Sequence, residues 1–135
     1  MDKIKWTKDL KLGIKILDEQ HKELIMRISD IIDSMNLNKK KDETINLLKR
    51  FKNEAIRHFS TEEKYMDNSD YPDTAGHKIL HTSFMQEFQA LANKVLKGEA
   101  GFECAVEFRE NIGDWFVRHI RMNDLNLASY IDGKF

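Results

Sequence analysis

The chain has 135 residues, a length typical of one domain. Its 22 Lys and Arg residues nearly balance its 23 Asp and Glu residues, so the basic stripe typical of nucleic-acid binding is not expected. The single cysteine, Cys104, cannot form an internal disulfide, which fits a reducing compartment. No apolar run approaches the roughly 18 residues that cross a bilayer, and the charged amino terminus lacks the apolar core of a signal peptide. We therefore predict a cytoplasmic protein without a nucleic-acid or membrane partner.

The composition and the spacing of apolar residues predict an all-α protein. One proline and six glycines interrupt the chain, strand-like alternation is absent, and charged helix formers are plentiful. The first residues form an extended arm in which Trp6 is the only large aromatic side chain, so we expect the arm to pack along the rest of the molecule. Four amphipathic helices follow, with expected bounds of 18–35, 42–67, 73–96 and 102–119.

Short connections between successive helices make neighbouring helices antiparallel. The expected architecture is an up-down-up-down antiparallel four-helix bundle in one domain. The arm covers residues 1–13, the bundle covers 14–122, and a short C-terminal tail covers 123–135. The tail contains enough apolar side chains for either a short final helix or a packed segment: Leu125, Leu127, Tyr130 and Ile131.

All histidines of the chain fall on the apolar stripes of the predicted helices, where core residues belong. A lone histidine on such a face is most often a core residue whose nitrogens have found partners. Several buried imidazoles without a shared role would each need separate partners, however, and two carboxylates accompany them. We interpret these residues as one metal site at the axis of the bundle: His21, His58, Glu62, His77, His81, His119 and Asp124.

The spacing within this set agrees with a common site. Residues four apart on an α-helix differ by about 400° of rotation and share a face, which applies to His58 with Glu62 and to His77 with His81. His119 and Asp124 are five apart, and a regular helix would leave them roughly 140° out of phase. For both to reach one site, the helix must end between them or contain a π-bulge, a feature that is frequent at functional sites.

The number of ligand groups indicates two ions. Five imidazoles and two carboxylates are too many for one tetrahedral zinc, whereas Glu62 and Asp124 could each bridge two ions through two oxygens. Imidazole with carboxylate suits iron, with zinc or manganese as alternatives. Counting a bridging solvent for both ions, eleven of the twelve positions of two six-coordinate irons are filled. The one open position could bind a small diatomic molecule.

Four segments that contain these residues resemble the signature segments of hemerythrins, in particular the bacterial hemerythrin-like proteins. The segments are IKILDEQHKELI from Ile14, HFSTEE from His58, HKILH from His77 and WFVRHIRMND from Trp115. The amino-terminal KWTKDLKLGI is also similar to the arm of that family. The resemblance extends from Lys5 to about Asp124.

The resemblance implies a non-haem di-iron site that binds O2. By matching position, one iron takes His77, His81 and His119 and is coordinatively full. The other iron takes His21 and His58 and keeps the open position. Glu62 and Asp124 bridge the two irons together with an oxo or hydroxo group, and both irons pass from ferrous to ferric when O2 binds.

Apolar residues beside the ligands are expected to line an O2 pocket, although ordinary core packing would also explain them: Leu24, Phe59, Trp115, Phe116 and Ile120. The predicted function is reversible O2 binding for storage, delivery or sensing, with NO or small anions as further ligands of the open iron. The protein is not expected to be an enzyme. The alternatives are a di-iron oxidase or peroxidase, a nitric oxide enzyme, and the sensing domain of a signalling protein. Di-iron enzymes of the ferritin-like kind use Glu-x-x-His pairs, which this chain lacks.

Overall fold

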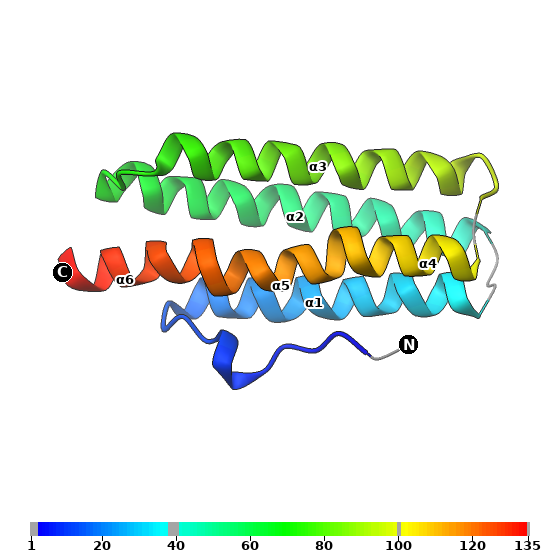
Figure 1. Cartoon of the computed structure of the whole chain (residues 1–135), viewed down its shortest axis with the longest axis horizontal. Helices are drawn as coiled ribbons and strands as arrows, with labels where there is room; N and C mark the ends of the chain where they lie inside the picture. The colour runs from blue at the N-terminus through cyan, green and yellow to red at the C-terminus, as the bar shows by residue number, and fades with distance from the viewer. Residues whose placement is uncertain (1–2, 38–40, 100, 135) are drawn as a thin grey trace.

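The computed structural model describes residues 3–37, 41–99 and 101–134. Within these ranges the chain forms four long helices and no strand (Figure 1). The first three are α1 (Lys15–Asn36), α2 (Lys41–Ser69) and α3 (Thr74–Leu96). The fourth is an unbroken run of α4, α5 and α6 joined by two π-helical segments, with bounds Phe102–Phe108, Arg109–Asp114, Trp115–His119, Ile120–Asp124 and Leu125–Lys134.

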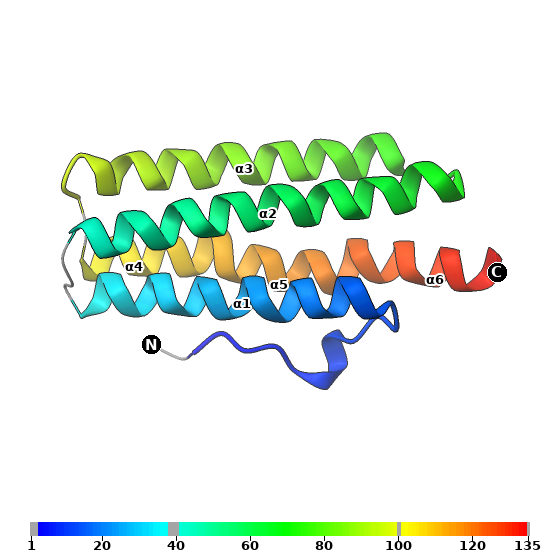
Figure 2. The ribbon, with the colours of Figure 1, turned by 180° about the vertical axis from the view of Figure 1, so that it is seen from behind.

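The predicted all-α bundle is confirmed. Successive helices run in opposite directions and lie side by side, as the two opposite views of the ribbon show (Figures 1 and 2). The fourth helix differs most from expectation, because it does not end near residue 119. Of the two forms expected for the tail, the structure contains the helix, and α6 continues the direction of α5 to residue 134.

The amino-terminal arm lies along the bundle and is anchored at several points (Figure 1). Ile4 and Leu10 are buried, and the Ser29 hydroxyl donates a hydrogen bond to the Ile4 carbonyl at 2.7 Å. The arm turns into α1 at Gly13, whose φ of 90° favours glycine. The buried carboxylate of Asp18 accepts hydrogen bonds from the Leu12 and Gly13 amides, at 2.8 and 3.1 Å. These contacts fix the chain immediately before the first predicted ligand.

The bundle axis has an apolar half and a polar half. Phe51, Phe88 and Phe108 pack together in the apolar half, with ring centroids 5.2 to 6.5 Å apart. In the other half, the start of α1, the end of α2, the start of α3 and the late part of the fourth helix meet, because neighbouring helices are antiparallel. All seven predicted ligands fall on these four stretches. The topology therefore brings them to one level of the bundle.

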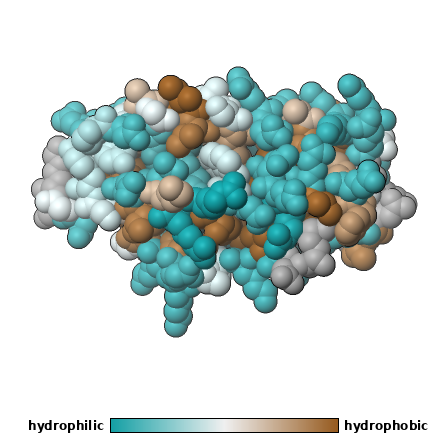
Figure 3. Space-filling model, in the orientation of Figure 1, coloured by the Kyte–Doolittle hydropathy of each residue, from teal (hydrophilic) through white to brown (hydrophobic). Residues whose placement is uncertain are grey.

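The surface is largely hydrophilic, with apolar side chains interspersed among charged ones on the face shown in Figure 3. Larger exposed apolar residues are distributed over all the long helices, and include Met26, Ile56, Ile79 and Leu125. Across the described ranges, no helix is both long and apolar enough to span a membrane.

Candidate metal centre

The seven predicted ligands are all buried and converge on the axis of the bundle. None of them is more than 3% exposed. They form two groups whose ligand atoms lie within 4.8 Å of one another. One group contains three histidines and the other contains two, and both groups share Glu62 and Asp124: His77, His81 and His119 in the first, His21 and His58 in the second. We call these the three-histidine half and the two-histidine half.

The second π-helical segment positions Asp124. Its i→i+5 hydrogen bonding places residue 124, rather than residue 123, one turn beyond His119. As a result the Asp124 carboxylate lies 3.0 Å from His119 Nε2 on its own helix and 3.0 Å from His21 Nε2 on the neighbouring α1. Of the two arrangements that the five-residue spacing allowed, a helix end or a π-bulge, the structure contains the π-bulge.

The donor atoms are spaced as ligands of a transition metal would be. His119 Nε2 lies 3.1 Å from His77 Nε2 and 3.3 Å from His81 Nε2. Metal–imidazole bonds are about 2.1 Å long, so two ligands at right angles lie about 3 Å apart. Glu62 and Asp124 each direct one carboxylate oxygen at the three-histidine half and the other at the two-histidine half. The distances from these oxygens to the nearest ring nitrogens are 2.8 to 3.4 Å.

Several of these short contacts do not have the direction of hydrogen bonds. His58 Nε2 lies 2.8 Å from a Glu62 oxygen, and both oxygens of Asp124 are within 3.1 Å of imidazole nitrogens. Nevertheless His58 Nε2 and both Asp124 oxygens are buried without a hydrogen-bond partner. Buried polar atoms are rarely left in this condition. Lone pairs that converge on a common point, instead of on each other, fit a site for cations.

Two residues outside the predicted set contact the outer ring nitrogens of two of the ligands. His81 Nδ1 is 2.9 Å from the Glu63 carboxylate, and His58 Nδ1 is 2.7 Å from Gln20 Oε1. Both acceptors lie beside a predicted ligand in the sequence. Helical phase shows only that Glu63 points away from Glu62, however, and gives no sign that it reaches across to α3. When Nδ1 carries the proton, Nε2 presents its lone pair to the centre.

Without a metal ion, the charges within the centre favour the protonated form of three of its imidazoles. Burial opposes the charged imidazole, but the carboxylates of Asp124 and Glu62 outweigh it and raise the pKa of His21, His77 and His119 to about 9. For His58, burial outweighs the carboxylates and lowers the pKa. Burial would raise the pKa of Asp124, yet the surrounding imidazoles hold it at about 2. The pKa of Glu62 lies well below its usual value for the same reason.

Aromatic rings enclose the histidines. Phe116 is buried with its ring edge against both imidazoles of the two-histidine half, at centroid distances of 5.8 Å to His21 and 6.1 Å to His58. Phe59 stacks on His81 at 4.0 Å, and Trp115 stacks on His119 at 4.6 Å. Among the predicted pocket residues, Phe116 therefore contacts the two-histidine half, whereas Trp115 contacts the three-histidine half. Leu24 and Ile120 are buried in the same core.

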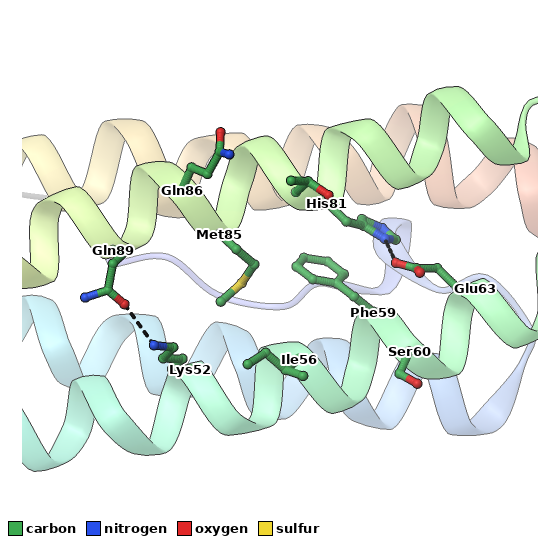
Figure 4. Close-up of a pocket in the computed structure, with 10 residues that line it drawn as sticks. Lys52, Ile56, Phe59, Ser60, Glu63, His81, Met85, Gln86 and Gln89 are labelled. Atoms are coloured by element: carbon green, nitrogen blue, oxygen red, sulfur yellow. Dashed lines mark hydrogen bonds and ion pairs between the residues drawn. The ribbon is translucent and has the colours of Figure 1, made fainter.

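A surface groove of about 530 Å³ between α2 and α3 reaches the outer side of the centre. Phe59, Glu63 and His81 line one end, and Figure 4 shows the Glu63 carboxylate directed at the His81 ring. Lys52 and Gln89 form a hydrogen bond across the other end, at 2.9 Å. The groove therefore gives solvent access to Glu63 and only to the outer edge of the three-histidine half.

The fold and the site together define a four-helix bundle with a buried centre of histidines and carboxylates suited to metal ions. The chain belongs to the hemerythrin family, because the family profile described as "Hemerythrin HHE cation binding domain" matches residues 12–131. The chain is 26% identical to a bacteriohemerythrin of Pseudomonas aeruginosa over 127 residues, covering 94% of this chain and 78% of that protein. It is 27% identical to a myohemerythrin of Theromyzon tessulatum over 119 residues, covering 88% and 86%. A hemerythrin-like protein of Naegleria gruberi is 28% identical over 120 residues, covering 89% and 87%.

Membership of this family implies non-haem iron, and the buried cluster of histidine, glutamate and aspartate fits such a site.

Proposed function

We propose that this protein binds O2 reversibly at a centre of two iron ions. The observation that supports this most is the unequal division of histidines, three in one half and two in the other, around two shared carboxylates. His77, His81 and His119 would hold one ion, His21 and His58 the other, and Glu62 and Asp124 would join both. With two carboxylate oxygens and one shared solvent atom, the first ion would have six ligands and the second would have five.

When bound, two ferrous ions with an oxo or hydroxo bridge supply the electrons and the open position for O2. The residues of the chain determine the rest. Phe116 lies against both histidines of the two-histidine half and excludes water there. His58 and His81 are fixed in orientation by Gln20 and Glu63. A dry and rigid surround favours release of O2 unchanged over further reaction, so we do not propose an enzymatic activity. Cytoplasmic location stays a prediction.

The test is an optical spectrum combined with an iron count. The iron-loaded protein is reduced without air, exposed to O2, and then depleted of O2 again. Two irons per chain and a visible charge-transfer band that appears and disappears with O2 would support the proposal. A band that appears once and persists would indicate rapid oxidation to the ferric state, as in an oxidase or peroxidase. A protein that takes up no iron would exclude the proposed function.

A further inference from the structure

The partners of His81 and His58 differ in charge. Glu63 offers a carboxylate to His81 Nδ1 in the three-histidine half, at 2.9 Å. Gln20 offers a neutral amide oxygen to His58 Nδ1 in the two-histidine half, at 2.7 Å. The two contacts are otherwise similar, because each joins the outer nitrogen of a predicted ligand to a side chain on a neighbouring helix.

The hydrogen bonds of Thr61 determine which end of the Gln20 amide faces His58. The Thr61 hydroxyl donates to the Arg57 carbonyl at 3.0 Å, so its oxygen is free to accept. Gln20 Nε2 lies 3.5 Å from that oxygen, the long end of the range for a hydrogen bond, and fits as the donor. The other end of the amide, Oε1, therefore faces His58 as an acceptor, and His58 Nδ1 must donate.

A hydrogen bond from the outer nitrogen makes an imidazole a more basic metal ligand, and a carboxylate acceptor does this more strongly than an amide because the bond is charge-assisted. A more basic ligand stabilises the higher charge of a ferric ion. The effect acts on the half of the centre to which the imidazole belongs.

We propose that Glu63 and Gln20 are positioning residues that give the two irons different reduction potentials, with the iron of the three-histidine half the easier to oxidise. This inference rests on the proposed di-iron function. Neither residue is a ligand of the ions. The difference in reduction potential that the two residues produce adds to the difference that arises from the unequal number of histidines.

The test is a redox titration of the iron-loaded protein, with the two one-electron steps followed by optical and Mössbauer spectroscopy. Glu63→Gln keeps an acceptor for His81 but removes the charge. We expect it to raise the potential of the iron in the three-histidine half by about 59 mV, which corresponds to a tenfold change in a one-electron equilibrium. Gln20→Glu makes the opposite exchange at His58. It should lower the potential of the other iron by a similar amount.

Glu107→Gln is the matched control. Its side chain has a similar exposure, 37% against 31% for Glu63, but it pairs with Lys94 and not with a histidine. Potentials that move in Glu63→Gln or in Gln20→Glu, each in the stated direction and by more than in the control, support the inference. Two bound irons with potentials unchanged relative to the control in both variants would overturn it. Failure of the unsubstituted protein to bind two irons would instead overturn the proposed function.

Discussion

The five imidazoles of the centre make different contacts, although all of them are buried. His77 illustrates this, because its Nε2 lies 3.1 Å from each of Glu62, Asp124 and His119. It therefore contacts both shared carboxylates and another histidine of its own half. A side chain in this position contributes to the site through one donor atom that no neighbour can replace.

His77→Ala should lower the bound iron from two per chain to about one or less, since the three-histidine half loses one of its ligands. Iron is counted by elemental analysis on the purified protein. Lys78→Ala is the control, because this neighbour on α3 pairs with Asp67 at the surface. Full iron content in the histidine variant would remove His77 from the proposed ligands.

Phe116→Leu should increase the rate at which the O2-bound protein becomes permanently ferric, by several-fold. The ring that shields His21 and His58 is replaced by a smaller side chain, and water gains access to the two-histidine half. Leucine is chosen because truncation to alanine would cost about 3–5 kcal/mol of stability. Trp115→Leu, which opens the space beside His119 instead, should have a smaller effect. Equal rates in both variants would show that the pocket is not where we place it.

The positions of the seven predicted ligands could be derived from the sequence because a polar residue on an apolar stripe is conspicuous. Glu63 and Gln20 could not be recognised in this way. A residue that points away from its own helix's stripe is normally solvated, and only the packing of α2 against α3 shows that Glu63 reaches His81. Recognising such partners requires the distance between two helices. The apolar periodicity of a single helix gives no information on that distance.

At the scale of elements, the fourth helix is distinguished by its two π-helical segments. The second is one of the two arrangements that the spacing of His119 and Asp124 allowed, the other being a helix end, and it carries the aspartate into the site. The first, at Arg109–Asp114, has no counterpart in the sequence analysis. It contains Gly113, which is buried against Ile4 of the amino-terminal arm. The same helix therefore uses one irregularity for the site and places the other against the arm.

Gly113→Ala should displace the arm, because an added Cβ at this position would collide with the Ile4 side chain. Gly133→Ala is the matched control: it lies in α6 with nothing within 4 Å of the added Cβ. Overpacking costs about 1–3 kcal/mol, whereas alanine is favoured over glycine in a helix by up to about 1 kcal/mol. In chemical denaturation, Gly113→Ala should therefore be less stable than Gly133→Ala by about 1–3 kcal/mol.

Ile4→Ala provides a further check on this explanation. If the collision with Ile4 is the cause, the Gly113 substitution should lose most of its effect when Ile4 is shortened as well. An unchanged effect in the double variant would mean that the π-helical backbone, and not the arm, requires glycine.

The bounds of the first three helices could be predicted to within three residues, because apolar periodicity and the turn residues agree there. The extent of the fourth could not. Its apolar period is interrupted at each π-helical segment, so the residues after Asp124 no longer appear to continue the same helix. Because the π-helical turn contains one residue more than an α-helical turn, the sequence pattern does not show that the helix continues to residue 134.

For the molecule as a whole, the centre couples folding to metal binding. The seven side chains occupy the polar half of the bundle axis, and without a cation they are held together by imidazole–carboxylate pairs. An ion that binds the folded chain better than the unfolded one stabilises it in proportion to the logarithm of its concentration. The bundle itself follows from the apolar half, which the sequence predicts without reference to metal.

Metal binding to the metal-free protein should release protons at neutral pH. The pKa values of His21, His77 and His119 are raised to about 9, so these imidazoles carry protons at pH 7 that a metal ion must displace. Apparent zinc affinity, measured by competition with a chelator, should therefore rise with pH from 6.5 and level off only above pH 9, where these imidazoles have lost their protons. The slope should correspond to about three protons at its steepest. An affinity independent of pH over this range would contradict the electrostatic description.

The central claim is that the centre holds two irons in unequal halves around shared carboxylates. It is tested most directly by X-ray diffraction from crystals of the iron-loaded protein, with data collected on both sides of the iron absorption edge. We predict two anomalous peaks on the bundle axis, one beside His77, His81 and His119 and the other beside His21 and His58, with Glu62 and Asp124 between them. A single peak, or peaks away from these residues, would contradict the account.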